Sequence, residues 1–167
     1  MQLITDISKA YNQLDWNVLQ NIMRKLGFDQ RWVQVAMETV TTASYSVLIN
    51  EEPRGFISQS RGIRQGDPLS PYLFLLCAKG LSALLRKAAE TWVLHEILSS
   101  QHGVCISHLL FADDSLFFFK ATIGECQQLL HILGQYEATS GQAINRPKTA
   151  LFFSKNIMLD VVRTLIQ

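Results

Sequence analysis

The sequence has few charged residues and almost no excess of either sign. Charged residues make up 17% of the 167 residues, and the formal net charge is +1. Proteins that bind nucleic acid on their own usually carry a strongly basic surface. If this chain handles nucleic acid, most of the positive charge that holds phosphates must come from other parts of a larger protein.

Cysteine is also scarce, and long apolar runs are missing. The three cysteines, Cys77, Cys105 and Cys126, are an odd number without a Cys-X-X-Cys spacing. This pattern argues against a disulfide framework and suits a reducing compartment. No apolar stretch approaches the roughly 18–20 residues of a membrane span, and Met1 opens no signal-peptide pattern. We therefore expect no contact with a membrane.

The sequence contains no repeat, low-complexity tract or linker, so we expect a single domain over residues 1–167. The spacing of apolar residues indicates where strands and helices lie. It predicts strands at 2–7, 44–50, 56–57, 92–98, 104–112, 115–120 and 148–154, and helices at 16–26, 29–40, 67–89, 122–141 and 158–166. Hairpins mixed with helices predict an α+β fold, an antiparallel sheet packed on helices.

Two adjacent carboxylates, Asp113 and Asp114, interrupt an apolar pair of predicted strands. Burying an unpaired carboxylate is costly, and two neighbouring ones repel each other. The pair therefore either lies on an exposed hairpin tip or holds something positive. Asp6, which ends the strand predicted at 2–7, either caps a turn or meets the pair across one sheet. Three such carboxylates would supply the hard oxygen ligands that Mg²⁺ prefers.

Residues 61–71, with the sequence RGIRQGDPLSP, form a third unusual segment. Two glycines, two arginines and a glutamine precede a predicted helix N-terminus. Backbone amides and guanidinium groups in such a loop are suited to contact phosphates or a sugar. A plain connection has a similar composition, so the loop alone leaves both interpretations open.

The three segments together resemble one family. The sequences DISKAY at 6–11, RGIRQGDPLSP at 61–71 and FADD at 111–114 resemble the first three palm motifs of non-LTR (LINE-type) retrotransposon reverse transcriptases, particularly those of plants. The sequence GQAIN at 141–145, followed by Lys148, is similar to the fourth motif. The resemblance covers essentially the whole chain. It implies a polymerase palm that is a piece of a longer protein, with the fingers, thumb and endonuclease regions largely missing.

The resemblance also implies the reaction, which is synthesis of DNA on an RNA template from a DNA primer and deoxynucleotides. Asp6 and Asp113 would bridge two Mg²⁺ ions, with Mn²⁺ able to serve in their place, and Asp114 would support them. Lys148 would approach the nucleotide phosphates and protonate the leaving group, or else it is a solvated surface lysine. The intact element would copy its RNA at a nicked chromosomal end, which implies the nucleus.

Four residues would bind the substrate if the resemblance holds. Tyr11 matches the aromatic gate that crowds a ribose 2′-hydroxyl, although a packed core ring is the alternative. Gln65 and Gly66 match the part of the second motif that lies against the incoming nucleotide, and Arg64 belongs to the same loop. Three competing interpretations of the chain are a retroelement relic without turnover, a group II intron maturase palm and an unrelated Mg²⁺-dependent phosphohydrolase.

Overall fold

The computed structural model describes residues 1–8, 10–98, 103–157, 160 and 162–163. The helix predicted at 158–166 therefore lies largely outside the described residues. In chain order the elements are β1 (Gln2–Ser8), α1 (Trp16–Lys25), α2 (Gln30–Thr41), β2 (Ser44–Ile49), β3 (Glu52–Ser58), α3 (Ser70–Glu90), β4 (Ile97–Leu98), β5 (Cys105–Ile106), β6 (His108–Phe111), β7 (Asp114–Phe118), α4 (Ile123–Ser140), β8 (Ala143–Ile144), the 3₁₀ turn η1 (Arg146–Lys148) and β9 (Ala150–Phe152).

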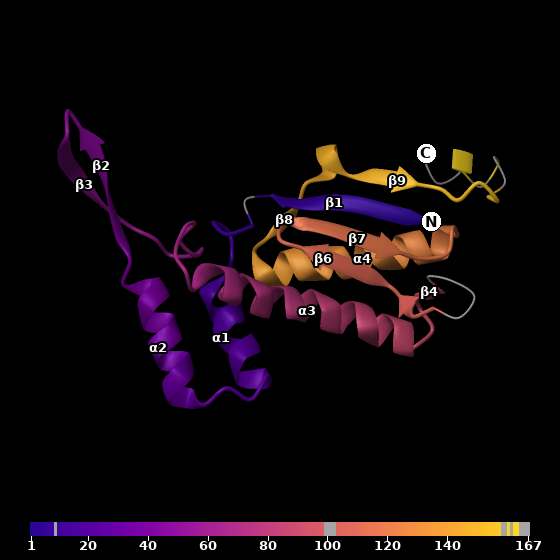
Figure 1. The fold of residues 1–167 in the computed structure, drawn as a ribbon, viewed down its shortest axis with the longest axis horizontal. Helices are drawn as coiled ribbons and strands as arrows, with labels where there is room; N and C mark the ends of the chain where they lie inside the picture. The colour runs from indigo at the N-terminus through magenta and orange to yellow at the C-terminus, as the bar shows by residue number, and fades with distance from the viewer. Residues whose placement is uncertain (9, 99–102, 158–159, 161, 164–167) are drawn as a thin grey trace.

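A five-stranded antiparallel sheet is built around β1, with α3 and α4 on one of its faces (Figure 1). β7 pairs with one edge of β1 and, on its other side, with β6. β9 and β8 pair with successive parts of the other edge of β1. Leu3, Thr5 and Ile7 are buried, and the residues between them are only half-buried. The α+β arrangement predicted from the sequence is confirmed.

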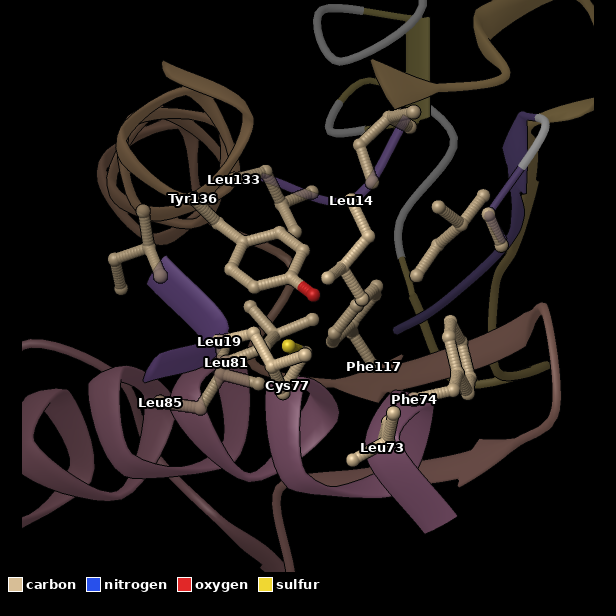
Figure 2. Close-up of a cluster of buried hydrophobic side chains, with 14 of the residues drawn as sticks. Leu14, Leu19, Leu73, Phe74, Cys77, Leu81, Leu85, Phe117, Leu133 and Tyr136 are labelled. Carbon is tan, nitrogen blue, oxygen red and sulfur yellow. The ribbon is translucent and has the colours of Figure 1, made fainter. Parts of the chain in front are cut away.

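The core lies between this sheet and the helices (Figure 2). Leu81 of α3, Leu19 of α1 and Phe117 of β7 are each at most 1% exposed. Successive buried positions on α3 recur at helical spacing and form one apolar stripe. Within it, burial raises the pKa of the Cys77 thiol to about 12, so this residue packs as a small neutral side chain.

Several predicted boundaries are wrong for local reasons. The helix predicted at 67–89 begins at Ser70, because the Asp67 side chain accepts a hydrogen bond from the Leu69 amide and forms a turn first. Only Ile97–Leu98 of the strand predicted at 92–98 is a strand. The preceding turn holds the Val93 amide, which donates to Ala88 at the end of α3.

The strand predicted at 56–57 is longer and forms β3. Further differences concern the later strands and residues 122–125, whose sequence TIGE predicts a capping box at the start of α4. The strand predicted at 104–112 is divided into β5 and β6, and the strand predicted at 148–154 is shortened to β9 by η1. Thr122 caps α4 by accepting from the Glu125 amide, as the capping box predicts. The Glu125 carboxylate instead accepts hydrogen bonds from the Lys120 and His95 amides.

One part of the chain, residues 30–58, projects away from the sheet and is called the arm (Figure 1). It consists of α2 and the β2–β3 hairpin, whose turn residues Asn50 and Glu51 both have positive φ, as a type I′ hairpin turn requires. Leu48 is 71% exposed and Phe56 is 77% exposed, so the apolar side chains of the hairpin face water. No helix among the described residues is long and apolar enough to cross a membrane.

Candidate active site

The Asp113-Asp114 pair lies at the tip of the β6–β7 hairpin. Phe111 pairs with Asp114, so Ala112 and Asp113 form a two-residue turn, in which Ala112 has a φ of 50°. Both aspartates are exposed. The Asp113 carbonyl accepts a hydrogen bond of 2.8 Å from the Ile7 amide, which fixes the tip against β1.

Asp6 meets this tip across the sheet, although it does not end its strand as predicted. β1 continues to Ser8 because Ile7 and Ser8 pair with β8. The register places Asp6 directly opposite Asp114 rather than Asp113. Opposite residues of antiparallel strands project from the same face, with Cβ atoms about 4.5–5.5 Å apart. Asp6 alternates with the buried Thr5 and Ile7, and Asp114 precedes the buried Ser115, so both carboxylates lie on the face of the sheet opposite these buried side chains.

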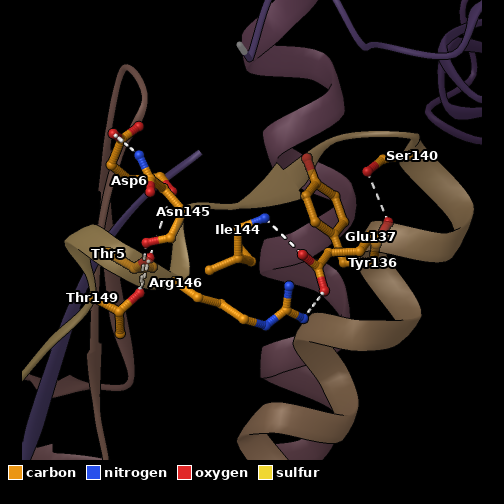
Figure 3. A network of polar contacts seen from close by, with 9 residues as sticks. All are labelled: Thr5, Asp6, Tyr136, Glu137, Ser140, Ile144, Asn145, Arg146 and Thr149. Carbon is orange, nitrogen blue, oxygen red and sulfur yellow. Dashed lines mark hydrogen bonds and ion pairs between the residues drawn. The ribbon is translucent and has the colours of Figure 1, made fainter. Parts of the chain in front are cut away.

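Two donors hold a single oxygen of the Asp6 carboxylate (Figure 3 shows the first). The side-chain amide of Asn145 donates to Oδ2 at 3.0 Å, and Nζ of Lys148 donates to the same atom at 2.9 Å. The hydrogen bond from Lys148 is the main cause that lowers the pKa of Asp6, and Asn145 adds to it. In return, Asp6 and the charges of Asp113 and Asp114 raise the pKa of Lys148. Asp6 therefore remains a carboxylate and Lys148 an ammonium.

A cavity of about 450 Å³ opens at this point, and five of the residues singled out in the sequence line it. These residues are Asp6, Tyr11, Gln65, Asp113 and Lys148. They come from four separate segments of the chain: β1 and the loop after it, the loop before α3, the β6–β7 tip and η1. Among residues with no role predicted from the sequence, Asn145 also lines this cavity.

Three predicted site residues are not brought into this cavity. Asp114 lies beside it on β7, opposite Asp6. Arg64 lines a separate cavity of about 20 Å³ with Tyr45 and Asp67, on the side of the arm. Gly66 follows Gln65 in the loop with a φ of 88° and nothing within 4 Å of an added Cβ, so its contribution is to the conformation of the loop backbone.

The segment after β1, residues 10–16, is held on one side by the loop that precedes α3. The Gly62 amide donates to the Leu14 carbonyl and the Ile63 amide donates to the Tyr11 carbonyl, both at 2.8 Å. The Trp16 indole donates to the Gly62 carbonyl at 2.6 Å. These three hydrogen bonds join the segment that carries Tyr11 to the loop that carries Gln65.

The loop after α4 holds the same segment on its other side. The Asp15 amide donates to the Ser140 carbonyl at 2.9 Å. The side-chain amide of Gln142, which is 1% exposed, donates to the Ala10 carbonyl at 2.7 Å. We call residues 10–16 the clamped segment, because both neighbouring loops fix its backbone.

The Tyr11 ring is fixed as well as its backbone. It stacks on Phe74 of α3 with ring centroids 5.2 Å apart and planes inclined by 14°. Phe74 is 2% exposed and belongs to the core, so the half-buried Tyr11 ring packs against a side chain that is itself held in place. No role is predicted from the sequence for Phe74, Asn145 or Gln142. Only the motif neighbourhood of Asn145 and Gln142, at 141–145, pointed to this region.

The cavity is suited to a divalent metal by its donor atoms, although it does not contain a ready-made cluster. Among the described residues, no three His, Cys, Asp or Glu side chains gather into a group able to hold a metal. Two carboxylates, Asp6 and Asp113, nevertheless line one cavity, and carboxylate oxygens are the hard ligands of Mg²⁺. The Lys148 ammonium now supplies the positive charge beside Asp6.

Comparisons with known proteins identify the family and the fold of the chain. Residues 1–159 match the family described as reverse transcriptase (RNA-dependent DNA polymerase). The Pol polyprotein of the type-1 retrotransposable element R2 of Popillia japonica is 29% identical over 146 residues, which are 87% of this chain and 23% of that polyprotein. An uncharacterized mitochondrial protein of Arabidopsis thaliana is 54% identical over 68 residues, which are 41% of this chain and 56% of that protein.

The fold has a counterpart among solved structures. Apo telomerase from Candida tropicalis, truncated from its C-terminal domain, matches 93% of this chain and 31% of that chain, with a TM-score of 0.70 and 15% identity. The chain thus spans less than two thirds of each of these three proteins. From the family match and the retrotransposon relatives, together with the antiparallel sheet and its cavity, it follows that the chain belongs to the reverse transcriptase family and has the fold of a polymerase palm.

Proposed function

We propose that this chain carries the catalytic centre for RNA-templated DNA synthesis, in which a primer 3′-hydroxyl is extended with deoxynucleotides by two-metal phosphoryl transfer. The observation that carries the proposal is the shared cavity. Asp6, Asp113, Tyr11, Gln65 and Lys148 line it from four segments of the chain. The carboxylate pair is suited to hold the metal ions of this reaction, and the ammonium group and the stacked aromatic ring are placed beside it to position the substrate.

The family generally depends on a divalent metal, and two carboxylates are the candidates to hold it. Asp6 and Asp113 would bind Mg²⁺, or Mn²⁺ in its place, with Asp114 in support from the position opposite Asp6. When bound, two such ions lower the pKa of the attacking hydroxyl and stabilise the charge on the leaving group. Asp6 is prepared for this role because its lowered pKa keeps it ionised.

Lys148 is suited to act on the phosphates of the incoming nucleotide. Its side chain is 70% exposed, while Nζ stays 2.9 Å from Asp6 at the edge of the cavity. The three neighbouring aspartates raise its pKa and keep Nζ protonated. Once Nζ has moved from Asp6 to the leaving pyrophosphate, it would donate that proton. Gln65 lines the same cavity and would contact the nucleotide from the side of the second motif.

Tyr11 would select deoxynucleotides by excluding the ribose 2′-hydroxyl. A steric gate requires an aromatic ring that keeps its position, because a mobile ring would move aside for one extra hydroxyl. The Tyr11 ring meets this condition, since Phe74 supports it from below and Ile63 holds its backbone carbonyl.

The substrates and setting follow from the same proposal. The template would be RNA and the primer DNA, and the intact element would act in the nucleus, where a nicked chromosomal end supplies the primer. The net charge of +1 gives this chain little general attraction for phosphates. Its retrotransposon relatives are several times longer. We propose that regions corresponding to the additional length of these relatives supply the surface that binds the template–primer duplex.

Primer extension on an RNA template with Mg²⁺ tests this proposal in a longer form of the protein that contains this chain. Asp113→Asn should lower turnover by orders of magnitude. Glu90→Gln removes an exposed carboxylate at the end of α3, outside the cavity, and should leave turnover unchanged.

A relic without turnover is the second candidate, because the carboxylates do not form a ready-made metal cluster among the described residues. In that case the longer form would extend primers no better than its Asp113→Asn variant. This result would contradict the proposed catalytic function.

A further inference from the structure

Asp6 presents its two carboxylate oxygens to different surroundings. Oδ2 accepts hydrogen bonds from Asn145 at 3.0 Å and from Lys148 at 2.9 Å. Oδ1 receives no hydrogen bond from any residue that the structure describes. The carboxylate lines the cavity with a side chain that is 15% exposed. Among the described residues, the donors to this carboxylate therefore all lie on one oxygen, and none lies on the other.

The neutral donor, Asn145, is itself fixed in place (Figure 3). Its backbone amide donates to the Asp6 carbonyl at 2.8 Å. Its backbone carbonyl accepts a hydrogen bond from the Thr149 hydroxyl at 3.0 Å. This hydroxyl lies 2.8 Å from the hydroxyl of Thr5, a residue that is 1% exposed. Because a carboxylate only accepts, the amide nitrogen must be the atom that Asn145 turns toward Asp6.

The charged donor, Lys148, differs from Asn145 in its mobility and in its charge. Its side chain is long and 70% exposed, so it can leave Asp6 without disturbing the fold. It is also a cation and competes with a metal ion for the same carboxylate charge. Asn145 is short, anchored and neutral, so it can stay on Oδ2 while a cation binds through Oδ1.

We propose that Asn145 is a positioning residue that holds Oδ2 of Asp6, so that Oδ1 faces the cavity as a metal ligand both before and after Lys148 moves to the nucleotide phosphates. This inference rests on the proposed function, because it takes Asp6 as a metal ligand. Residues that orient a ligand by hydrogen bonding contribute to metal affinity, and their loss typically costs about 10- to 100-fold.

The two donors are thus expected to affect metal binding in opposite directions. Asn145→Ala leaves the Asp6 carboxylate held by a mobile group alone, so affinity should fall by about 10- to 100-fold. Lys148→Met keeps much of the length of the side chain but removes the competing cation, so affinity should stay equal or rise. A general loosening of the site would weaken binding in both variants.

The test measures binding of Mn²⁺ alone to the 167-residue chain by electron paramagnetic resonance, which requires no turnover. Asp6→Asn sets the background. Asn21→Ala removes an exposed amide from α1 and is the matched control, expected to bind like the unaltered chain. Circular dichroism checks that each variant is folded. If Asn145→Ala fails to fold, Asn145→Ser, whose hydroxyl is too short to reach Oδ2, should show the same loss.

Two results would overturn this inference alone. One is unchanged Mn²⁺ affinity in the folded Asn145 variant, and the other is an equal loss of affinity in Lys148→Met. A different result would overturn the proposed metal site together with the inference: the unaltered chain binding Mn²⁺ no better than Asp6→Asn. The failure of the inference is therefore distinguishable from the failure of the proposed function.

Discussion

Gly141 offers a direct test of the clamped segment. It ends α4 in the left-handed conformation with a φ of +75°, and a Cβ atom added there would lie 2.7 Å from the Gln13 carbonyl oxygen. Neither residue can easily move away, because the Asp15 amide next to them donates a hydrogen bond to the Ser140 carbonyl. Gly141→Ala should therefore combine backbone strain with a steric clash.

The expected loss of stability has two parts. The left-handed conformation costs an alanine about 1–2 kcal/mol, and forcing one more carbon into a packed contact typically costs about 1–3 kcal/mol. The free energy of unfolding should therefore fall by roughly 2–5 kcal/mol. In a domain of this size, each kcal/mol corresponds to a fall of about 2–4 °C in Tm.

Two other glycines separate the parts of this loss. Gly27 has a φ of +84° with nothing within 4 Å of an added Cβ, so Gly27→Ala carries the strain alone. Gly134 lies inside α4 with no neighbour within the same distance, so Gly134→Ala should stabilise by about 0.5–1 kcal/mol. Urea unfolding followed by circular dichroism measures all three. If Gly141→Ala costs no more than Gly27→Ala, the contact between the two loops does not exist as described.

Three further predictions concern the cavity. In a longer form that polymerises, Tyr11→Ala should admit ribonucleotides markedly better while Tyr11→Phe should not, and equal sugar discrimination in all three proteins would refute the gate. The pKa of Asp6 is lower in the folded chain than in the unfolded chain, where it is near 3.9. The ionised carboxylate therefore stabilises the fold fully above this unfolded pKa. This stabilisation is lost as the pH falls through the pKa of Asp6 in the folded chain. Asp6→Asn should accordingly lose less stability than the unaltered chain on acidification below pH ~4, and parallel acid unfolding curves would contradict the Lys148 contact. The 167-residue chain alone should not extend a primer, because positioning of the substrates contributes about 7–11 kcal/mol and its relatives are far longer; activity above the Asp113→Asn background would show that the palm suffices.

Local sequence signals predicted the elements that local interactions determine. Thr122 and Gly141, at the two ends of α4, are recognisable from their residue types because one accepts from a first-turn amide and the other adopts positive φ. The turn at Asp113 is similarly recognisable, since apolar strands flank it on both sides. These features depend on neighbours only a few residues away.

The misplaced features depend on partners distant in the sequence. β1 runs one residue beyond the predicted end at Ile7, to Ser8, where both residues pair with β8, more than 130 residues later. Arg64 is one residue from Gln65, yet the loop turns it toward the arm, and no spacing rule predicts that direction. The contact of Asn145 with Asp6 likewise depends on the tertiary fold, although the fourth motif marked its neighbourhood.

The β2–β3 hairpin of the arm affects how this chain behaves in concentrated solution. A two-stranded hairpin is marginally stable by itself, and a strand edge with unpaired amides can add a strand from another molecule. The β3 edge is protected by Glu52, Pro53 and Arg54, whereas β2 has the sequence SYSVLI, with neither charge nor proline. Self-association through β2 would therefore increase with protein concentration. Sedimentation velocity would measure the highest concentration at which the chain is still a monomer, and Mn²⁺ titrations should stay below it.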